Sequence, residues 1–277
     1  MILLLNSDNF LGNAIAAELL RQHKKFFRIS NDIFINNLTV SYDDSGAFWE
    51  VDGDKVYIKE FTAVYCGYYS NNDSPALCKN GYESYYLASC WEAYLQYVLV
   101  KIPLKIGVIK HEFSLGNFLQ LPVFYKIING FGLKSPSYIY RCHQTEAIND
   151  LGKGDYYFCN KLYCEDICSF KKLLDSSALI IEKKLNMWGK ILIIADNLYF
   201  FTLECGVWVE RDLNLSIKNN IKKLLNVFDV TLGKIILRYN SSFKDYVFYG
   251  MNLNLSAIEM ELLPKDIADV AIRFLSR

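Results

Sequence analysis

Three closely spaced cysteines, Cys159, Cys164 and Cys168, are the first residues in this chain that suggest chemistry. Cysteine thiolates bind zinc, and Cys164 and Cys168 lie four residues apart, which would place both on one face of a helix. However, the chain has no Cys-x-x-Cys pair, and none of its three histidines lies near the cluster. We therefore favour buried thiols over a zinc site at these positions.

Tyrosines are the second group of candidate residues, and they crowd into the segment from Tyr65 to Tyr97 together with Trp91. Tyrosine buries a large area while keeping a polar hydroxyl group, which is why binding surfaces use it often. The segment would suit a groove for a peptide, and it would equally suit the subunit interface of a homodimer. The alternative is a tyrosine-rich helix that belongs to the core.

Composition excludes several classes of protein. The chain has 277 residues, 52% of them hydrophobic, and its 30 Lys and Arg residues balance 30 Asp and Glu residues. We therefore expect a folded protein whose partners include no nucleic acid. The apolar start at Met1–Asn6 has no basic residues and resembles a strand more than a signal peptide, and no apolar run is long enough to cross a membrane. Eight cysteines without an export signal indicate reduced thiols and a cytoplasmic location.

The first part of the chain predicts an α/β domain. A buried strand at Ile2–Leu5 is followed by helical spacing from Leu11 to Leu20 and by a second apolar run at Phe26–Ile29. This order opens a parallel sheet of Rossmann-like type. Beyond it we expect a hairpin, a strand, a long helix and another strand, at 47–58, 62–66, 82–99 and 106–109. The alternation ends near 113–116, where we place a domain boundary.

The second part predicts an α+β domain. Gly130, Gly132 and Pro136 end a helix that begins near Leu121. The spacing of apolar residues then predicts strands at 137–141, 156–162, 178–184, 190–195 and 198–204, helices at 144–151, 165–174 and 215–228, a hairpin at 235–249 and a terminal helix at 264–274.

This order of elements resembles the ATP-grasp fold over nearly the whole chain. Phe131–Ile139, with Gly-Leu-x-x-Pro before an apolar strand, is similar to the entry into that family's nucleotide-clamping subdomain. The resemblance implies a short pre-ATP-grasp α/β domain at 1–112 and an ATP-grasp domain at 113–277. The latter would consist of a nucleotide-clamping subdomain at 113–185 and a C-terminal subdomain at 186–277.

The resemblance also implies which residues hold the cofactors, ATP and magnesium. Lys161 matches a strand lysine that contacts the ATP phosphates, and Glu182 with Lys183 matches the hinge strand that meets adenine and ribose. Lys190 is the basic residue that survives where the family has Glu-Leu-Arg, here Trp188-Gly189-Lys190. Without the resemblance, Lys161 and Glu182 would be interpreted as solvated charges of edge strands.

The metal site departs from the family pattern. Ile236 stands where the pattern has a metal-binding Asp, and Gly250-Met251-Asn252 stands where it has Glu-x-Asn. Leu121 also replaces a lysine that often precedes the proline in the subgroup. Magnesium prefers carboxylate oxygens, so Asn252 together with Glu259 and Glu261, which follow closely, is the predicted metal set. Asn252 also fits the role of a turn residue that bonds its own backbone.

Two functional hypotheses remain at this stage. The subgroup with this layout modifies ribosomally made peptides, as in microviridin-type ester and amide formation, so the chain resembles an ATP-dependent carboxylate ligase that acts on a peptide substrate. The loss of both metal carboxylates favours the alternative, a degenerate ATP-grasp protein that binds a peptide or a partner enzyme as a scaffold or regulator. The sequence assigns no catalytic residue.

Overall fold

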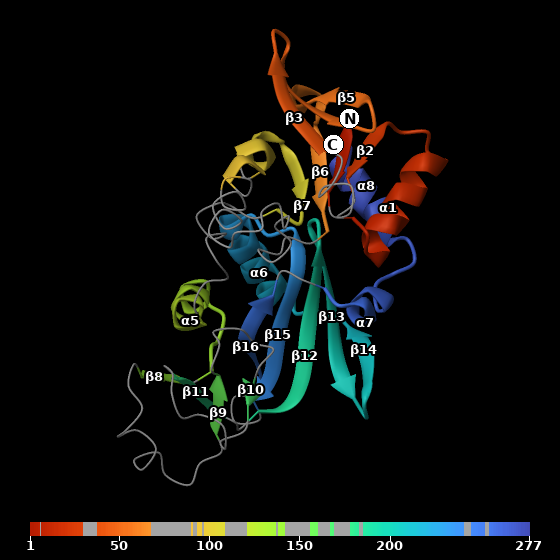
Figure 1. Cartoon of the computed structure of the whole chain (residues 1–277). Coiled ribbons are helices and arrows are strands. Elements are labelled where there is room, and N and C mark those ends of the chain that lie inside the picture. Colours follow the sequence, from red (N-terminus) through yellow and green to blue (C-terminus); the bar gives the residue numbers. More distant parts are fainter. Residues whose placement is uncertain are drawn as a thin grey trace. The chain divides into compact units, whose positions relative to one another are not determined.

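In the computed structural model the chain forms two compact units (Figure 1). The first unit comprises Met1–Glu112, Val230–Leu232 and Ser256–Arg277, and the second comprises Phe113–Asp229 and Gly233–Leu255. The structure describes residues 1–5, 7–29, 38–67, 90, 93–95, 97–108, 121–136, 138–141, 156–159, 167–168, 178–182, 185–240, 245–252 and 255–277.

A parallel sheet forms the centre of the first unit, as the opening strand–helix–strand pattern predicts. Its order is β2-β1-β6-β7, and every residue of the central strand β1 is buried, as expected for a parallel strand covered on both faces. The amide N–H of Gly12 donates a 2.7 Å hydrogen bond to the side chain of Asn9, which caps helix α1. The elements are β1 (Ile2–Leu5), α1 (Phe10–Arg21), β2 (Phe26–Ile29), β6 (Ala63–Cys66) and β7 (Leu104–Ile106).

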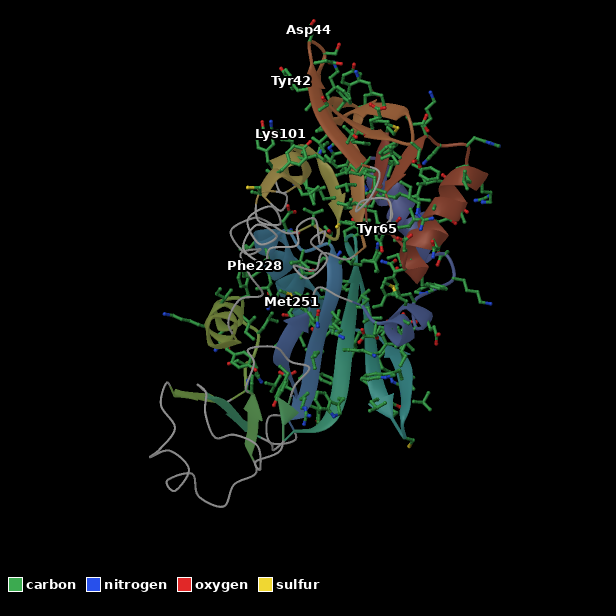
Figure 2. All side chains as sticks on the ribbon, in the orientation of Figure 1. Tyr42, Asp44, Tyr65, Lys101, Phe228 and Met251 are labelled. Carbon is green, nitrogen blue, oxygen red and sulfur yellow. The ribbon has the colours of Figure 1, made fainter. Side chains whose placement is uncertain are left out.

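An antiparallel sheet of order β3-β4-β5 precedes β6, and its first strand was not expected from the sequence. Asp52 and Gly53 both have positive φ angles, 52° and 89°, and they form the tight turn that joins β4 to β5. Figure 2 labels Tyr42 and Asp44 at the tip of the β3–β4 hairpin. The elements are β3 (Leu38–Asp43), β4 (Gly46–Val51), β5 (Asp54–Tyr57) and the short 3-10 helix η1 (Ile58–Glu60).

An ion pair near this tip makes the hairpin sensitive to acid. Lys55, which donates to the carboxylate of Asp43, lowers the pKa of Asp43 to about 2, and Ser45 N–H and the Tyr57 hydroxyl also donate to this carboxylate. Because the folded pKa lies below the unfolded value, the pair stabilises the fold above about pH 4. We expect the difference in unfolding free energy between the unmodified chain and Asp43→Asn to shrink as the pH falls from 4 to 2. Urea titrations at several pH values measure it, with Asp44→Asn as the control for a lost surface carboxylate.

Trp49 lies at the centre of the core of the first unit. It is fully buried, its ring centroid is 5.6 Å from that of Phe61, and its Nε1–H donates a 2.9 Å hydrogen bond to the hydroxyl of Tyr94. Residues 97–101 are helical, which agrees with the predicted long helix in the part described. Tyr65 is also buried, and its hydroxyl donates to the side chain of Asn9. Tyr65 therefore belongs to the core, whereas Tyr97 is 61% exposed.

The last residues of the chain belong to the first unit. Helix α8 (Ile267–Leu275) contacts α1, β6 and β7, and α7 (Ala257–Glu261) contacts α1. The apolar face of α8 is buried, and the side chain of Gln22 donates to Asp269. The sequence-based division at 113–277 differs here, because it keeps 256–277 in the second domain. The amphipathic face of α8 gives the reason, since it needs an apolar partner and the first sheet supplies one.

The second unit contains a four-stranded antiparallel sheet of order β10-β9-β11-β8. The helix predicted at 165–174 is wrong at Ile167–Cys168, which pair as a short strand with Phe158 and Cys159. Cys168 is therefore not on a helix face with Cys164, which lies outside the described residues, as does the helix predicted at 144–151. The elements are α5 (Leu121–Gly130), β8 (Tyr138–Arg141), β9 (Tyr156–Cys159), β10 (Ile167–Cys168) and β11 (Ala178–Glu182).

A five-stranded sheet of order β14-β13-β12-β15-β16 follows. Its central strand β12 begins at Leu185, five residues earlier than predicted, and α6 ends at Phe228 because Asp229 adopts a left-handed conformation. None of the helices in the described part of the chain combines the length and apolar character needed to cross a lipid bilayer. The elements are β12 (Leu185–Ile194), β13 (Asn197–Glu204), β14 (Val207–Arg211), α6 (Leu215–Phe228), β15 (Leu232–Asn240) and β16 (Asp245–Asn252).

Candidate functional site

The strand register brings together the two positions where the sequence departs from a metal site. Ile236 on β15 pairs directly with Gly250 on β16, and two residues away Lys234 pairs with Asn252. Residues that pair across neighbouring strands point to the same face of a sheet. Two sequence motifs that were found 14 residues apart therefore meet on one face, as two ligands of one ion would have to. Figure 2 marks the place on β16 through Met251, which lies between Gly250 and Asn252.

A β-bulge adds an aromatic ring to this face. Ile236 pairs with Gly250 whereas Leu237 pairs with Phe248, so Tyr249 is the extra residue on β16. The hydroxyl of Tyr125 on α5 donates a 2.7 Å hydrogen bond to the carbonyl oxygen of Tyr249 and so holds the bulged backbone in place. The ring of Tyr249 lies edge-on to Trp188 of β12, with 6.2 Å between their centroids.

Three cationic side chains share the same face. Lys234 and Arg238 flank Ile236 at alternate positions of β15, and Lys190 alternates with Trp188 on β12. Arg238 contacts Trp188, because its guanidinium carbon lies 3.3 Å from the ring centroid. Although charged side chains are rarely buried, only 7% of Lys190, 8% of Lys234 and 3% of Arg238 is exposed. We call Lys190, Lys234 and Arg238 the cationic face.

Aromatic rings hold two of these cations. The guanidinium of Arg238 lies 5.2 Å from the Tyr249 centroid, and Lys190 Nζ lies 3.8 Å from the centroid of Trp208 on β14. A cation over an aromatic face gains roughly 0.5–2 kcal/mol, with the larger values at sites shielded from water.

Two carboxylates share this face by register: Glu210, through Phe201, is exposed on the edge strand β14, and Asp245, which pairs with Asn240, forms a 3.0 Å ion pair with Lys134. The described residues of the face thus carry charges of both signs.

Comparison with solved structures places this geometry in a known fold. The chain matches the macrocyclase MdnC from Microcystis aeruginosa, bound with the precursor peptide MdnA, with a TM-score of 0.76 and 16% identity, covering 100% of both chains. A RiPP-associated ATP-grasp ligase from Chryseobacterium gregarium, in complex with ADP and a leader and core peptide, matches with a TM-score of 0.73 and 16% identity over 99% of this chain and 96% of that one. This chain has the ATP-grasp fold.

A third ATP-grasp structure, the ligase PsnB complexed with a minimal precursor, Mg and ADP, gives a TM-score of 0.75 at 12% identity over 100% of this chain and 98% of that one. No family model and no curated protein matches the sequence. The fold predicted from the order of elements and motifs is confirmed. Because these identities are low, the likeness establishes the ATP-grasp fold, and activity has to be argued from the residues of this chain.

The described residues at the position where the sequence pattern predicts a metal do not suit magnesium. Ile236 and Gly250 carry no side-chain oxygen, and the described residues contain no group of three His, Cys, Asp or Glu side chains that could hold a metal. Lys234 and Arg238 each lie two residues from Ile236. Positive charge on the residues that flank Ile236 disfavours a divalent cation there.

The other predicted site residues lie away from this face of the C-terminal sheet or outside the described residues. Lys161 and Lys183 are outside the described residues, and Glu182 is the last residue of β11, where it pairs with Tyr156. Glu259 lies in α7 of the first unit, where its carboxylate accepts a 2.9 Å hydrogen bond from the N–H of Ser256 in a capping box. Glu261 is exposed at the end of the same helix. Their metal role stays a prediction.

Of the predicted site residues, Lys190 and Asn252 lie on the face of the C-terminal sheet described above. The sequence analysis missed Lys234 and Arg238, although it singled out Ile236, which lies between them. The available signal was their spacing: in a strand, residues two positions on either side of Ile236 must share its face. Tyr249 carried no such signal, because only the bulge turns it to this side.

Proposed function

We propose that this chain binds ATP and a ribosomally made peptide and activates a carboxylate for ester or amide bond formation. The observation that carries the proposal is the cationic face on the last sheet of an ATP-grasp fold. The similar solved structures support it, since MdnC is bound with its precursor peptide and the Chryseobacterium ligase is in complex with ADP and a leader and core peptide.

The side chains of the cationic face would hold the phosphates. Lys190, Lys234 and Arg238 supply charged donors, and Arg238 adds a planar group that matches two phosphate oxygens at once. When bound, ATP supplies the phosphoryl group that turns a carboxylate into a reactive acyl donor. In this proposal Lys161 adds a further phosphate contact, and Glu182 and Lys183 contact the adenine and ribose.

One observation favours a second candidate function. Ile236 and Gly250 pair across β15 and β16, and neither carries the carboxylate that the family pattern has at its position for magnesium. A protein of this kind would bind nucleotide and peptide without joining them, as a scaffold or regulator of a partner enzyme.

Turnover with a peptide distinguishes the two candidates. We would incubate the purified chain with ATP and synthetic peptides that carry both a carboxylate side chain and a hydroxyl or amino group, and follow ADP release and peptide mass. A ligase releases ADP and lowers the peptide mass by one water for each bond formed. Lys190→Ala is expected to slow ADP release roughly tenfold to hundredfold, because a charged hydrogen bond contributes about 1.5–3 kcal/mol.

The matched control is Lys223→Ala on α6, an exposed lysine of the same unit, which should leave the rate unchanged. Circular dichroism shows whether both variants are folded. ATP binding without ADP release or peptide modification would reject the ligase and support the scaffold. Absence of ATP binding would reject both.

A further inference from the structure

We propose that two copies of this chain pair through the free edge of β3, so that their β3-β4-β5 sheets join into one antiparallel sheet. β3 is the first strand in that order, and among the described strands it pairs only with β4. An edge strand presents a row of backbone N–H and C=O groups that a second strand can bond. This pairing is independent of the nucleotide site.

The middle of β3 lacks the charges that protect edge strands. The other edge strands of the first unit each carry a cation: Arg28 in β2, Lys105 in β7 and Lys55 in β5. Such charges discourage pairing with another chain, because taking them out of water is costly. In β3 the residues at 38–42 are uncharged, and none of them is buried. The sequence of β3 therefore leaves its edge open to a partner strand.

Val40 and Tyr42 add apolar surface at this edge. Val40 pairs with Trp49 and therefore shares the face of the sheet that forms the core. Trp49 is fully buried, yet Val40 is 38% exposed, and Tyr42, the next residue of β3 on this face, is 78% exposed. Figure 2 labels Tyr42 near the tip of the hairpin. The core face of β3 thus continues into solvent, where a second strand would cover it.

A second copy of β3 fits this edge because the strand is complementary to itself. In an antiparallel pair centred on Ser41, Val40 of each copy lies opposite Tyr42 of the partner subunit. A β-branched side chain beside an aromatic ring is a favourable cross-strand pair. On the other face Ser41 meets Ser41 of the partner subunit, and Thr39 meets Asp43 of the partner subunit, so that each hydroxyl faces a group that can accept its hydrogen bond.

The charges at the hairpin tip permit this pairing. Because the strands are antiparallel, Asp44 of one copy lies near the base of the other hairpin and away from the second Asp44. Within each tip Lys55 forms an ion pair with Asp43, and Lys59 donates a 2.8 Å hydrogen bond to the carbonyl oxygen of Ser45. Charges of both signs near each tip thus balance, and the two hairpins repel each other little.

The contact is small, so the dimer should be weak. Two short paired strands bury less than the roughly 1,200 Å² of a stable interface. We therefore expect a dissociation constant of about 10–100 µM, with the chain a monomer at about 1 µM. At that low concentration, substitutions at Tyr42 should leave the unfolding free energy almost unchanged, because no dimer is present to stabilise the fold.

Sedimentation equilibrium of the full chain, at concentrations from about 1 to 200 µM, tests the pairing. We expect the average mass to rise from that of one chain toward that of two. Tyr42→Lys places a charge opposite Val40 of the partner subunit and should weaken the dimer by about tenfold or more. The matched control is Val207→Lys, at an exposed apolar residue on the edge strand β14, which should leave the mass curve unchanged. A chain that stays monomeric over the whole range would overturn the proposal.

Cysteine variants test the strand and its register. In the pairing centred on Ser41, Ser41→Cys brings two thiols directly opposite each other, within the roughly 4.4–6.8 Å between Cα atoms that a disulfide spans. Thr39→Cys is the matched control, because it lies opposite Asp43. With oxidised glutathione, Ser41→Cys should form a covalent dimer several times faster than Thr39→Cys or the unmodified chain, in which Cys90 and Cys205 are exposed. A non-reducing gel measures the rates, and equal rates for Ser41→Cys and Thr39→Cys would contradict pairing through β3.

Discussion

The double variant Ile236→Asp/Gly250→Glu is expected to bind ATP about a hundredfold more weakly than the unmodified chain in EDTA, and to regain binding when magnesium is added. The two positions pair across β15 and β16, so the new carboxylates would stand between Lys234 and Arg238. There they would compete with the phosphates for the cations, at about 1.5–3 kcal/mol per charged contact. A magnesium ion held by both carboxylates would reverse the effect.

Calorimetry with ATP in the two buffers measures this change, and circular dichroism shows that the variant folds. The uncharged variant Ile236→Asn/Gly250→Gln is the matched control, because it adds similar volume without charge. It should bind ATP equally in both buffers. If the acidic variant binds ATP in EDTA as tightly as the unmodified chain, these positions do not face the nucleotide.

Trp49→Ala is expected to lower the unfolding free energy of the first unit by about 3–5 kcal/mol, the usual cost of deleting a large buried ring. Trp49 is fully buried, contacts Phe61 and donates to the Tyr94 hydroxyl at 2.9 Å. Its loss would leave a cavity beneath the parallel sheet and remove that hydrogen bond. Urea denaturation followed by circular dichroism measures the effect.

Two further variants make this stability prediction specific. Trp49→Phe keeps most of the apolar volume but loses the hydrogen bond to Tyr94, so its cost should be smaller. Tyr42→Ala removes an aromatic ring that is 78% exposed at the hairpin tip (Figure 2) and should change the free energy by less than about 0.5 kcal/mol. Equal costs for Trp49→Ala and Tyr42→Ala would contradict the role assigned to Trp49.

The parallel sheet of the first unit could be predicted because its sequence signals are local and mutually consistent. Ile2–Leu5 is apolar throughout and lies between two strands, and Asn9 caps the helix that follows. The strands β12 and β13 have equally clear apolar runs, and the turn that joins them, Ala195–Asp196, lies one residue before the predicted Asp196-Asn197. Segments that carry their own apolar pattern and end signals are therefore the predictable part of this fold.

Segments whose structure depends on distant partners could not be predicted. The spacing of apolar residues at 165–174 predicts a helix, yet Ile167–Cys168 pairs with β9 and forms a strand. None of the residues of β3 is buried, so the strand has no buried face and is defined by its pairing with β4. The place of α8 in the first unit follows from contacts with β6, β7 and α1, which are far from it in sequence.

The site was predictable only in part for a similar reason. The motif order pointed to Ile236, Gly250 and Lys190, and the strand pairing places the first two together. The role of Lys234 and Arg238 could be predicted only by asking which residues share a face of β15 with Ile236. The role of Tyr249 could not be predicted, because the spacing of residues does not reveal the bulge in β16. Glu259, predicted as a metal ligand, forms a capping box with Ser256 that the sequence analysis did not predict, and its metal role stays a prediction.

A crystal structure of the full chain grown with ATP and EDTA tests the central claim most directly. The account predicts phosphate oxygens within hydrogen-bond distance of Lys190, Lys234 and Arg238, over the pair Ile236–Gly250. ATP bound away from this face of the C-terminal sheet would contradict it.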